Sequence, residues 1–387
     1  MKFRHIIQKS LLAMMAAVAL SSCDMMTEDL SDCPTGLYVN FVYDYNIERA
    51  DMFKDHVGGL TLYVYDESDR LAAQRTVSGS ELQKYGYCIH FTEKELAPDH
   101  TYRLQAVALQ KDWSAALNTP GAKYRKTELA KGDDRKGFSV KLDRQQSAIA
   151  PYYSVSAVAP LDTLWHTLTT LQTTEANLPA ATKYHQLRDG SVQSNGVESV
   201  TVVSGEPTYA TVSLIRDTNH LNISLREIDK PENVSHEDYE VFIVDANGDV
   251  DYNNNLITPT DSLIYTPYAQ WTTAYDGNGT IGMQYSAHYD LMFNRLNYDP
   301  SPQKNAVLCI RKKSTDQIVI ALNLAEVLCQ GRTAYEIYSY TPQEYLDRAY
   351  DFRLEFFLKG EQWKFVSELY LCIDALSWAK RIQIEDL

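Results

Sequence analysis

The sequence predicts a mostly-β protein with two domains in tandem and a few short helices. Tyrosine is abundant, with 27 residues in a chain of 387, and Thr, Val and Ile recur in short runs. This composition favours strands over helices. About 365 residues remain once the N-terminal targeting segment described below is set aside, which is more than one hydrophobic core of ordinary size holds. We therefore expect two domains.

Alternating apolar and polar residues predict the strands of the N-terminal half. In the run GLYVNFVYDYN, every second residue from Leu37 to Tyr45 is apolar. Residues Asp66 to Asp69 (DESD) suit a hairpin turn after the second strand. The further predicted strands are Gly59–Tyr65, Gly86–Phe91, Thr101–Gln110, Phe138–Leu142, Tyr152–Val158, Leu164–Leu171 and Glu198–Val203.

The C-terminal half has the same texture, and its clearest strand is Ile281 to Phe293. There every second residue is apolar, which indicates one buried and one wet face. The connection between the first two strands of this half is Asp217-Thr218-Asn219. The other predicted strands are Ala210–Arg216, Leu221–Arg226, Val241–Val244, Ala306–Arg311, Gln317–Leu322, Phe352–Leu358 and Phe365–Ile373. A turn signal, GEPT, places the domain boundary near residue 204.

Two short helices stand out against the strands. Thr341 provides an N-cap, Pro342 the first helical position and Glu344 an acid three residues after the cap, which together predict a capped helix. Its Tyr345 should pack onto the sheet. A second helix is expected within 322–330, with Gly331 ending it.

The N-terminus reads as a lipoprotein signal. Basic residues precede the apolar run LLAMMAAVAL, which closes on Leu20-Ser21-Ser22-Cys23. The run is about half the ~20 residues that a membrane-spanning helix needs, so it indicates a removed signal peptide. Only small side chains fit just before the lipid-modified cysteine, and Ser21 and Ser22 meet this requirement. We predict that residues 1–22 are removed and that Cys23 carries the lipid, which would anchor the protein durably to a membrane.

Six cysteines stand at positions 23, 33, 88, 309, 329 and 372. A secreted chain favours disulfides, and five cysteines remain if Cys23 is lipidated. Spacing does not fix their pairing. Cys33 precedes the first strand and Cys88 lies within a later one, so our first hypothesis is a disulfide between Cys33 and Cys88. A pairing of Cys309 with Cys372 is the second.

Charge and motifs exclude several function classes. The net charge of −15 argues against binding to nucleic acid. The histidines form no H-E-x-x-H pattern, and no P-loop or G-x-S-x-G is present, so no local motif indicates an enzyme or a cofactor. The glycine pattern at 277–282 lacks the helix that a dinucleotide site requires. Five scattered tryptophans could form a carbohydrate platform, although core packing is the favoured role.

One acidic stretch resembles a calcium loop. Asp245, Asn247, Asp249 and Asp251 carry oxygen ligands at alternate positions around a glycine. The glycine is fourth rather than sixth, and Leu256 stands where an EF-hand has glutamate. Asn247-Gly248 between apolar runs favours a hairpin turn. No metal is therefore predicted, with weak calcium binding as the alternative.

Several segments together resemble the fimbrillin-associated anchor proteins of type V fimbriae. They are the lipobox cysteine, the start CPTGLYVNF from Cys33, DYNIERADMFKDHVGGLTLYVYD, VSLIRDTNHLNISL, FNRL, PQEYLDRAYDF and IDALSWAKRIQI. The likeness covers nearly all of the mature chain. It implies two transthyretin-like antiparallel β-sandwich domains, which with the boundary above span 36–204 and 205–387. The short acidic segment before them, which has no periodicity, predicts a lipidated flexible tether at 23–35. The likeness also implies an outer-membrane lipoprotein with no catalytic residues, which holds a fimbrium to the cell.

The resemblance also implies a mechanism. Shaft subunits of such fimbriae lose an N-terminal strand to a protease, and the open groove accepts a C-terminal strand from a neighbour. With its own N-terminus tied to lipid, this protein should keep its groove closed and stop polymerisation. We expect its C-terminal segment to enter the basal shaft subunit, with Trp378, Ile382 and Ile384 in the donor segment. The competing hypothesis is a surface lipoprotein that binds glycans or nutrients.

Overall fold

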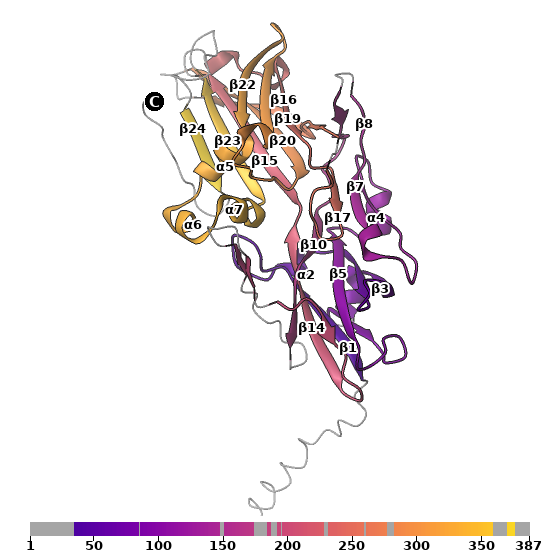
Figure 1. Ribbon diagram of the computed structural model, residues 1–387. Helices are drawn as coiled ribbons and strands as arrows, with labels where there is room; N and C mark the ends of the chain where they lie inside the picture. The colour runs from indigo at the N-terminus through magenta and orange to yellow at the C-terminus, as the bar shows by residue number, and fades with distance from the viewer. Residues whose placement is uncertain are drawn as a thin grey trace, which may run out of the picture.

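The computed structural model describes residues 35–84, 86–147, 151–173, 184–186, 192–194, 196–227, 231–258, 261–276, 282–358 and 370–375. Within these ranges the chain is mostly β, as predicted, and its strands form two main bodies along an elongated molecule (Figure 1). No helix in the described ranges is long and apolar enough to cross a membrane. The predicted lipid site Cys23 and the predicted donor residues Trp378, Ile382 and Ile384 lie outside the described residues.

The N-terminal body is one sheet with the strand order β3-β2-β5-β10-β14-β1-β4, and β13 also pairs with β5. Strand β1 runs parallel to β14, whereas the other neighbours in this sheet are antiparallel. The bounds are β1 Gly36–Val42, β2 Gly59–Tyr65, β3 Leu71–Ser78, β4 Cys88–Phe91, β5 Thr101–Leu109, β10 Leu164–Thr173, β13 Val200–Thr201 and β14 Pro207–Arg216.

Two sheets form most of the C-terminal body. Their strand orders are β19-β20-β15-β23-β24 and β22-β21-β16-β18-β9-β8. The bounds of the first sheet are β15 Thr218–Glu227, β19 Ala269–Asp276, β20 Met283–Asn294, β23 Asp351–Leu358 and β24 Tyr370–Ala375. Those of the second are β8 Gln145–Gln146, β9 Tyr153–Ser154, β16 Tyr239–Asp245, β18 Leu263–Tyr265, β21 Val307–Lys312 and β22 Gln317–Asn323.

Strands from the first half of the sequence enter the C-terminal body. Strands β8 and β9 extend the second sheet through the β18–β9 pair, and a small sheet joins β6 and β7 to β17. The bounds of this small sheet are β6 Tyr124–Lys126, β7 Ser139–Leu142 and β17 Asp249–Asp251, and the hairpin of β11 and β12 spans Tyr184–Gln186 and Val192–Ser194. The segment between β5 and β10 therefore ties the two bodies together.

The point at which the chain changes sheet differs from the predicted boundary. Strand β14 follows residue 204 but pairs with β1 and β10 in the N-terminal sheet. Strand β15 begins at Thr218 and belongs to the C-terminal sheet. The change of sheet therefore falls at Asp217 rather than between 204 and 205. The predicted connection was Asp217-Thr218-Asn219. In the structure it is Asp217 alone, because Thr218 and Asn219 belong to β15. The division into two independent domains stays a prediction.

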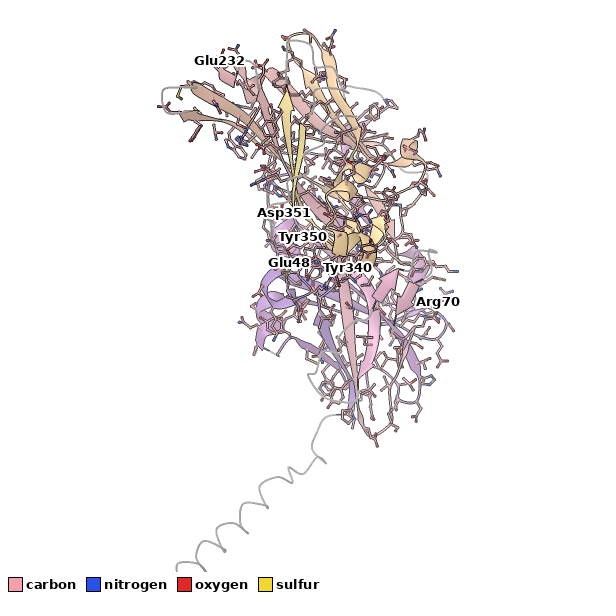
Figure 2. The ribbon with its side chains drawn as sticks, turned by 90° about the vertical axis from the view of Figure 1, so that its left-hand side faces the viewer. Glu48, Arg70, Glu232, Tyr340, Tyr350 and Asp351 are labelled. Atoms are coloured by element: carbon pink, nitrogen blue, oxygen red, sulfur yellow. The ribbon has the colours of Figure 1, made fainter. Side chains whose placement is uncertain are left out.

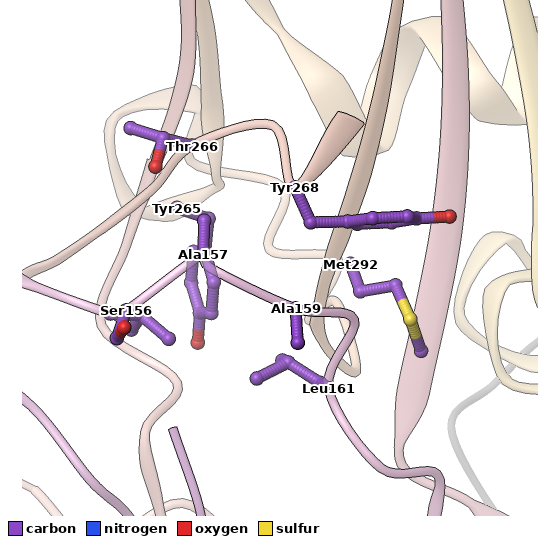
Figure 3. A pocket seen from close by; sticks show the side chains of 9 residues that line it. Ser156, Ala157, Ala159, Leu161, Tyr265, Thr266, Tyr268 and Met292 are labelled. Carbon is purple, nitrogen blue, oxygen red and sulfur yellow. The ribbon is translucent and has the colours of Figure 1, made fainter. Parts of the chain in front are cut away.

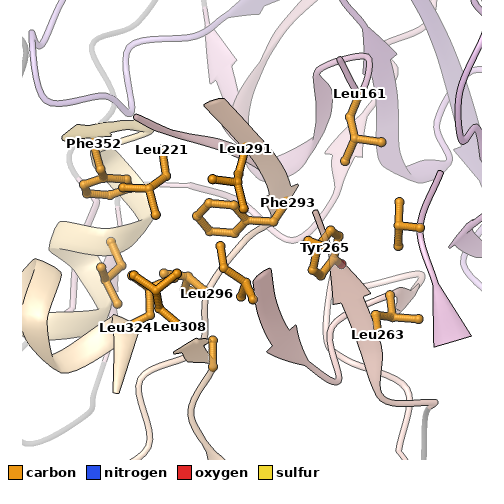
Figure 4. Packing of buried hydrophobic residues seen from close by; sticks show 14 of the residues in the cluster. Leu161, Leu221, Leu263, Tyr265, Leu291, Phe293, Leu296, Leu308, Leu324 and Phe352 are labelled. Carbon is orange, nitrogen blue, oxygen red and sulfur yellow. The ribbon is translucent and has the colours of Figure 1, made fainter. Parts of the chain in front are cut away.

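Strand β2 of the N-terminal sheet is buried on both faces. Along β2, Leu60, Leu62 and Val64 pack in a core confined to the N-terminal body. The alternate residues Tyr63 and Tyr65 belong to a larger core that continues into the C-terminal body. Figure 4 shows part of this larger core between its sheets and helices. Because a strand's side chains alternate between faces, one seven-residue strand contributes to both cores.

Short helices occupy the connections. Their bounds are α2 Phe53–His56, α3 Gly79–Lys84, α4 Trp113–Leu117, α5 Leu324–Gln330, α6 Ala334–Ser339 and α7 Pro342–Arg348, with 3₁₀ turns η2 Arg135–Gly137, η3 Pro231–Asn233, η4 His236–Asp238 and η5 Pro302–Lys304. The predicted helix at Thr341 is confirmed as α7, since the Thr341 side chain accepts from the Glu344 N–H at 3.2 Å and Tyr345 is buried. The second prediction is confirmed as α5, which Gly331 ends.

Candidate functional site

The two bodies meet around Asp217, the residue between β14 and β15. In Figure 1 these two strands follow one another along the molecule. The Asp217 N–H donates to the Leu164 carbonyl, and its own carbonyl accepts from the Arg295 N–H, both at 2.8 Å. Leu164 begins β10 of the N-terminal sheet, and Arg295 follows β20 of the C-terminal sheet. The backbone of Asp217 is thus bonded to both bodies.

The Asp217 carboxylate is buried and has three partners. His166 Nδ1 donates to Oδ2 at 2.5 Å, and Asn254 Nδ2 donates to Oδ1 at 2.7 Å. Arg295 Nε lies 3.4 Å from Oδ1. His166 is 1% exposed and Asp217 is 3% exposed. Since a buried carboxylate is costly unless it is paired, each of these contacts holds the junction in one geometry.

Arg295 extends this cluster into helix α7. Its guanidinium forms an ion pair of 3.3 Å with Asp347, a helix residue that is 9% exposed. Burial raises the pKa of Asp347, and the charge of Arg295 acts against that shift. The chain that connects the sheets is therefore coupled through Arg295 to the helix that covers them.

A second set of contacts joins the loop after β1 to the α6–α7 region. The Ile47 N–H donates to the Arg348 carbonyl at 3.0 Å, and the Arg348 guanidinium lies 4.0 Å from the centre of the Tyr45 ring. Arg49 Nε donates to the Tyr340 hydroxyl at 2.9 Å. In Figure 2 the labelled Glu48 and Tyr340 both lie at the level where the two bodies meet. These contacts join the two bodies through residues that are distant in sequence from Asp217.

The N-terminal strand is an interior strand of its sheet. Strand β1 pairs over its full length with β14 and also with β4. Gly36, its first residue, lies opposite Pro207, at the end of β14 that is farther from Asp217. Gly36 has φ +115°, and a Cβ atom there would lie 2.2 Å from the Phe91 carbonyl oxygen. The chain therefore enters the fold through a glycine at the end of the molecule remote from the junction.

The last described strand, β24, lies at the edge of its sheet and pairs with β23. Ala375, its final residue, lies opposite Phe352, the second residue of β23. Phe352 is also paired with Leu221 near the start of β15. The chain therefore leaves β24 at the end of the sheet that faces the junction. The predicted donor segment follows three residues later.

The predicted disulfide cannot be placed within the described residues, because Cys33 lies outside them. Cys88 has no disulfide partner among the described residues, and burial raises the pKa of its thiol to about 11. Cys309 has none among them either, and the side chain of Cys372 is not described. Both pairings stay predictions.

The side chains of the suspected calcium loop have separate partners. Asp249 accepts two hydrogen bonds from Arg144, at 2.8 and 2.7 Å. The Asn247 amide accepts from the Tyr265 hydroxyl at 2.6 Å, while Asp251 accepts from the backbone of its own turn, at Asn253 N–H. Asp245 accepts from the Ala246 N–H, and burial raises its pKa to about 7. In the described ranges, no three His, Cys, Asp or Glu side chains form a group suited to a metal.

The prediction of a hairpin at Asn247-Gly248 is wrong, because the strands on its two sides, β16 and β17, do not pair with each other. Strand β16 ends at Asp245 and pairs with β18 and β21, whereas β17 pairs with β7. Asn247 is 1% exposed and bonds to the Asn294 and Arg295 carbonyls, so it belongs to the junction. The buried tertiary contacts of the asparagine therefore outweigh its local turn preference.

The described tryptophans do not gather on one surface. Trp113 and Trp165 are buried in different cores. Trp271 is 37% exposed and stacks on His288, with ring centres 5.2 Å apart. Trp363 and Trp378 lie outside the described residues. The three described indoles therefore form no common platform.

A small recess lies between residues 155–161 and the connection after β18 (Figure 3). Tyr265, Tyr268 and Met292 contribute to its wall, and the nine lining residues include no Asp, Glu, His, Cys, Lys or Arg. Its volume of about 220 Å³, part of it open to solvent, is below the ~300–1,000 Å³ typical of small-molecule sites.

Sequence reasoning missed the junction cluster. His166 and Asp217 are 51 positions apart, so no local motif links them. A weak signal is present, because His166 interrupts the largely apolar and β-branched run of β10 and Arg216-Asp217 ends the run of β14. A polar residue in a strand that is buried on both faces lies in the core, where polar groups have hydrogen-bond partners.

Comparison with known proteins places the chain in a family. The family model described as fimbrillin-A associated anchor proteins Mfa1 and Mfa2 matches residues 30–188 and 191–383. A search of curated proteins finds no match.

Solved structures share the fold over most of the chain. A candidate adhesin from Bacteroides thetaiotaomicron is 23% identical, with a TM-score of 0.65, and the match covers 92% of this chain and 100% of that one. A candidate polysaccharide-binding protein from the same species is 24% identical, with a TM-score of 0.61 and coverage of 90% and 98%. The fimbrial anchor protein Mfa2 from Porphyromonas gingivalis is 14% identical, with a TM-score of 0.52 and coverage of 90% and 99%. At these identities the likeness shows the fold, whereas the family model matches most of the sequence. The chain belongs to the fimbrillin-A associated anchor proteins.

Proposed function

We propose that this protein anchors a fimbrium to the outer membrane and terminates its assembly. Lipid on Cys23 would hold one end of the molecule, and residues 378–387 would enter a groove of the basal shaft subunit as an added strand. The membership of the family and the arrangement of the two chain ends support this role.

The observation that carries the proposal is the position of β1. A shaft subunit must lose a strand to open its groove, whereas β1 here is paired on both sides, with β14 and with β4. Removing it would break two ladders of backbone hydrogen bonds, and buried unpaired backbone groups are costly. A subunit that keeps this strand offers no groove to a further subunit, so growth would stop at it.

The junction gives the anchor a mechanical role. Tension between a lipid at the N-terminal end and a strand leaving near the junction passes through the N-terminal sheet. Strand β14 connects that sheet to Asp217, whose contacts with His166 and Arg295 bind both bodies. Buried contacts of this kind resist separation better than exposed ion pairs do.

Substitutions on the two faces of the proposed donor segment test its role. Ile382 and Ile384 alternate with Gln383 and Glu385, so one pair would enter pockets and the other would face outward. Replacing both isoleucines by serine should release fimbriae from the cells, with the anchor still present in the membrane fraction. The variant Gln383→Ser with Glu385→Ser is the matched control and should retain them. Equal retention by both variants would remove the donor role.

A further inference from the structure

Helix α6, Ala334–Ser339, is unusual because none of its residues is buried. Short helices are unstable alone in water and normally gain stability by packing an apolar face. Helix α6 instead has a capping box, in which the Thr333 side chain accepts from the Glu336 N–H and Glu336 accepts from the Thr333 N–H. The helix is thus preformed without a core contact of its own.

Three large apolar side chains of α6 face water. Tyr335 is 57% exposed, Ile337 46% and Tyr338 79%. In the described part of the chain, no other stretch of four residues carries more than one exposed large apolar side chain. We call Tyr335, Ile337 and Tyr338 the α6 patch. Tyr335 and Tyr338 stand three positions apart and so lie on one face of the helix, whereas Ile337 lies on another. Exposed apolar side chains that gather on one short helix mark a surface that another segment covers.

The α6 patch is fixed in place from the N-terminal body. The Arg49 guanidinium lies 4.5 Å from the centre of the Tyr335 ring and 5.6 Å from that of Tyr340, the residue after the helix. Arg49 also donates to the Tyr340 hydroxyl. This stack shows that the aromatic rings of the patch region accept a guanidinium on their faces.

The chain leaves β24 at the end of the sheet where α7, the helix after α6, packs on β23. Ala375 lies opposite Phe352, and the Phe352 ring centre is 6.5 Å from that of Tyr345 in α7. In Figure 1 β24 and α6 lie on the same side of the C-terminal body, with α6 nearer the junction. Because β24 runs antiparallel to β23, its final residue points the chain toward the junction. The α6 patch therefore lies on the side to which the following residues are directed.

The residues after Ala375 have the chemistry that the patch fits. The segment 376–387 reads LSWAKRIQIEDL and carries Trp378, Ile382 and Ile384 together with Lys380 and Arg381. Six residues of this segment would span ~20 Å if extended, which exceeds the ~9 Å length of the six-residue helix α6. The segment is therefore long enough to run along the whole helix. The apolar side chains match the α6 patch, and the two cations match its exposed aromatic faces.

We propose that residues 376–387 dock on the α6 patch before they are transferred to a shaft subunit. The identity of this segment as the donor rests on the proposed function, but docking itself does not. A donor strand with three large apolar side chains would otherwise be exposed to unwanted strand pairing. Docking also lowers the apparent affinity for the shaft subunit by the fraction of molecules in which the segment is docked. The α6 patch thus protects the donor and sets a threshold for its transfer.

Hydroxyl-radical footprinting of the detergent-solubilised full chain tests the docking. The oxidation rate of Trp378 is measured by mass spectrometry and compared with that of a synthetic peptide of residues 376–387. We expect Trp378 in the protein to oxidise about tenfold more slowly, as for a segment docked about nine-tenths of the time. Replacing Tyr335, Ile337 and Tyr338 by serine should return the rate to that of the peptide. Leu117→Ser, at a residue 45% exposed on α4, should leave it unchanged.

Two results would overturn the docking proposal. One is oxidation of Trp378 at the peptide rate in the unsubstituted protein, and the other is a protected Trp378 that the triple serine variant leaves protected. Circular dichroism establishes that the triple variant is folded. The donor role is measured separately by fimbrial retention with Ile382 and Ile384 replaced. Retained fimbriae there, with Trp378 protected by the α6 patch, would refute donation and leave docking intact.

Discussion

His166 Nδ1 donates a 2.5 Å hydrogen bond to Asp217 Oδ2, and Asp217 is the residue at which the chain passes from the N-terminal sheet to the C-terminal sheet. The histidine comes from β10, within the N-terminal sheet. The same carboxylate contacts Asn254 and Arg295 of the C-terminal body. One side chain at the crossing point is therefore shared by both bodies, which makes the junction the first place to test stability.

Replacing His166 by alanine should destabilise the protein by about 3 kcal/mol, because it leaves the buried Asp217 carboxylate with fewer partners. Urea unfolding measures the change. The control is Arg70→Ala, which removes an ion pair with Asp134 whose side chains are 52% and 44% exposed. Such a pair contributes about 1 kcal/mol or less. Similar losses in both variants would show that the junction contact is no stronger than a surface pair.

Gly36→Ala should weaken the pairing of β1. The new Cβ would meet the Phe91 carbonyl oxygen at 2.2 Å, and φ +115° is unfavourable for alanine. We expect a loss of about 2–3 kcal/mol in urea unfolding. Gly205→Ala has φ +74° and open space around the Cβ position, so its cost should be about 1 kcal/mol. An equal cost at both positions would contradict the close approach of β1 and β4.

Asp245 should make stability depend on pH. Burial raises its pKa to about 7 in the folded state, against about 4 in the unfolded chain. The folded state therefore binds the proton more tightly, and this contribution is complete below pH ~4 and lost as the pH rises through ~7. Asp245→Asn, which cannot ionise, should be more stable than the wild type at pH 8 by roughly 4 kcal/mol. Its advantage should vanish near pH 4. Urea unfolding across this range measures it, and a constant difference would refute a raised pKa.

Calcium should have no effect on thermal stability. Asp249 is paired with Arg144, and Asn247 is bonded to Tyr265 within the junction. An ion would have to break these contacts before it could bind. Differential scanning calorimetry in calcium and in chelator should give Tm values within ~1 °C, since a ligand that binds the folded state raises Tm. A clear rise with calcium would restore the loop as a metal site.

Strands with a clear apolar pattern could be predicted from the sequence. The run ending at Phe293 is β20, and its alternation indicates one buried face. The predicted strand Gly59–Tyr65 has the same bounds as β2, an apolar and aromatic run that is buried on both faces. Strand β3 was not predicted, since only half of its sequence LAAQRTVS is apolar, without regular alternation, and the strand lies at an edge. Alternation in the sequence arises when one face of a strand is buried. An edge strand of intermediate exposure therefore shows little alternation.

The junction could not be predicted, because it is built from contacts between distant residues. The sequence placed a turn at Asp217, since Asp, Thr and Asn favour turns. In the fold Thr218 and Asn219 continue as β15, paired with β20. Strand pairing therefore overrides the local turn preference here. At Asn247, buried hydrogen bonds to distant residues override it in the same way. The family resemblance, in contrast, was confirmed because it depends on the order of many segments along the chain.

The most direct test of the anchoring role is the fate of fimbriae in cells that carry Cys23→Ser. The substitution removes the proposed lipid site and leaves every described residue of the fold unchanged. Fimbriae are quantified in washed cells and in the medium, with secretion of the variant verified by immunoblotting. The account predicts intact fimbriae in the medium with the variant protein attached to them. Fimbriae that stay on the cells in wild-type amounts would contradict the anchoring role.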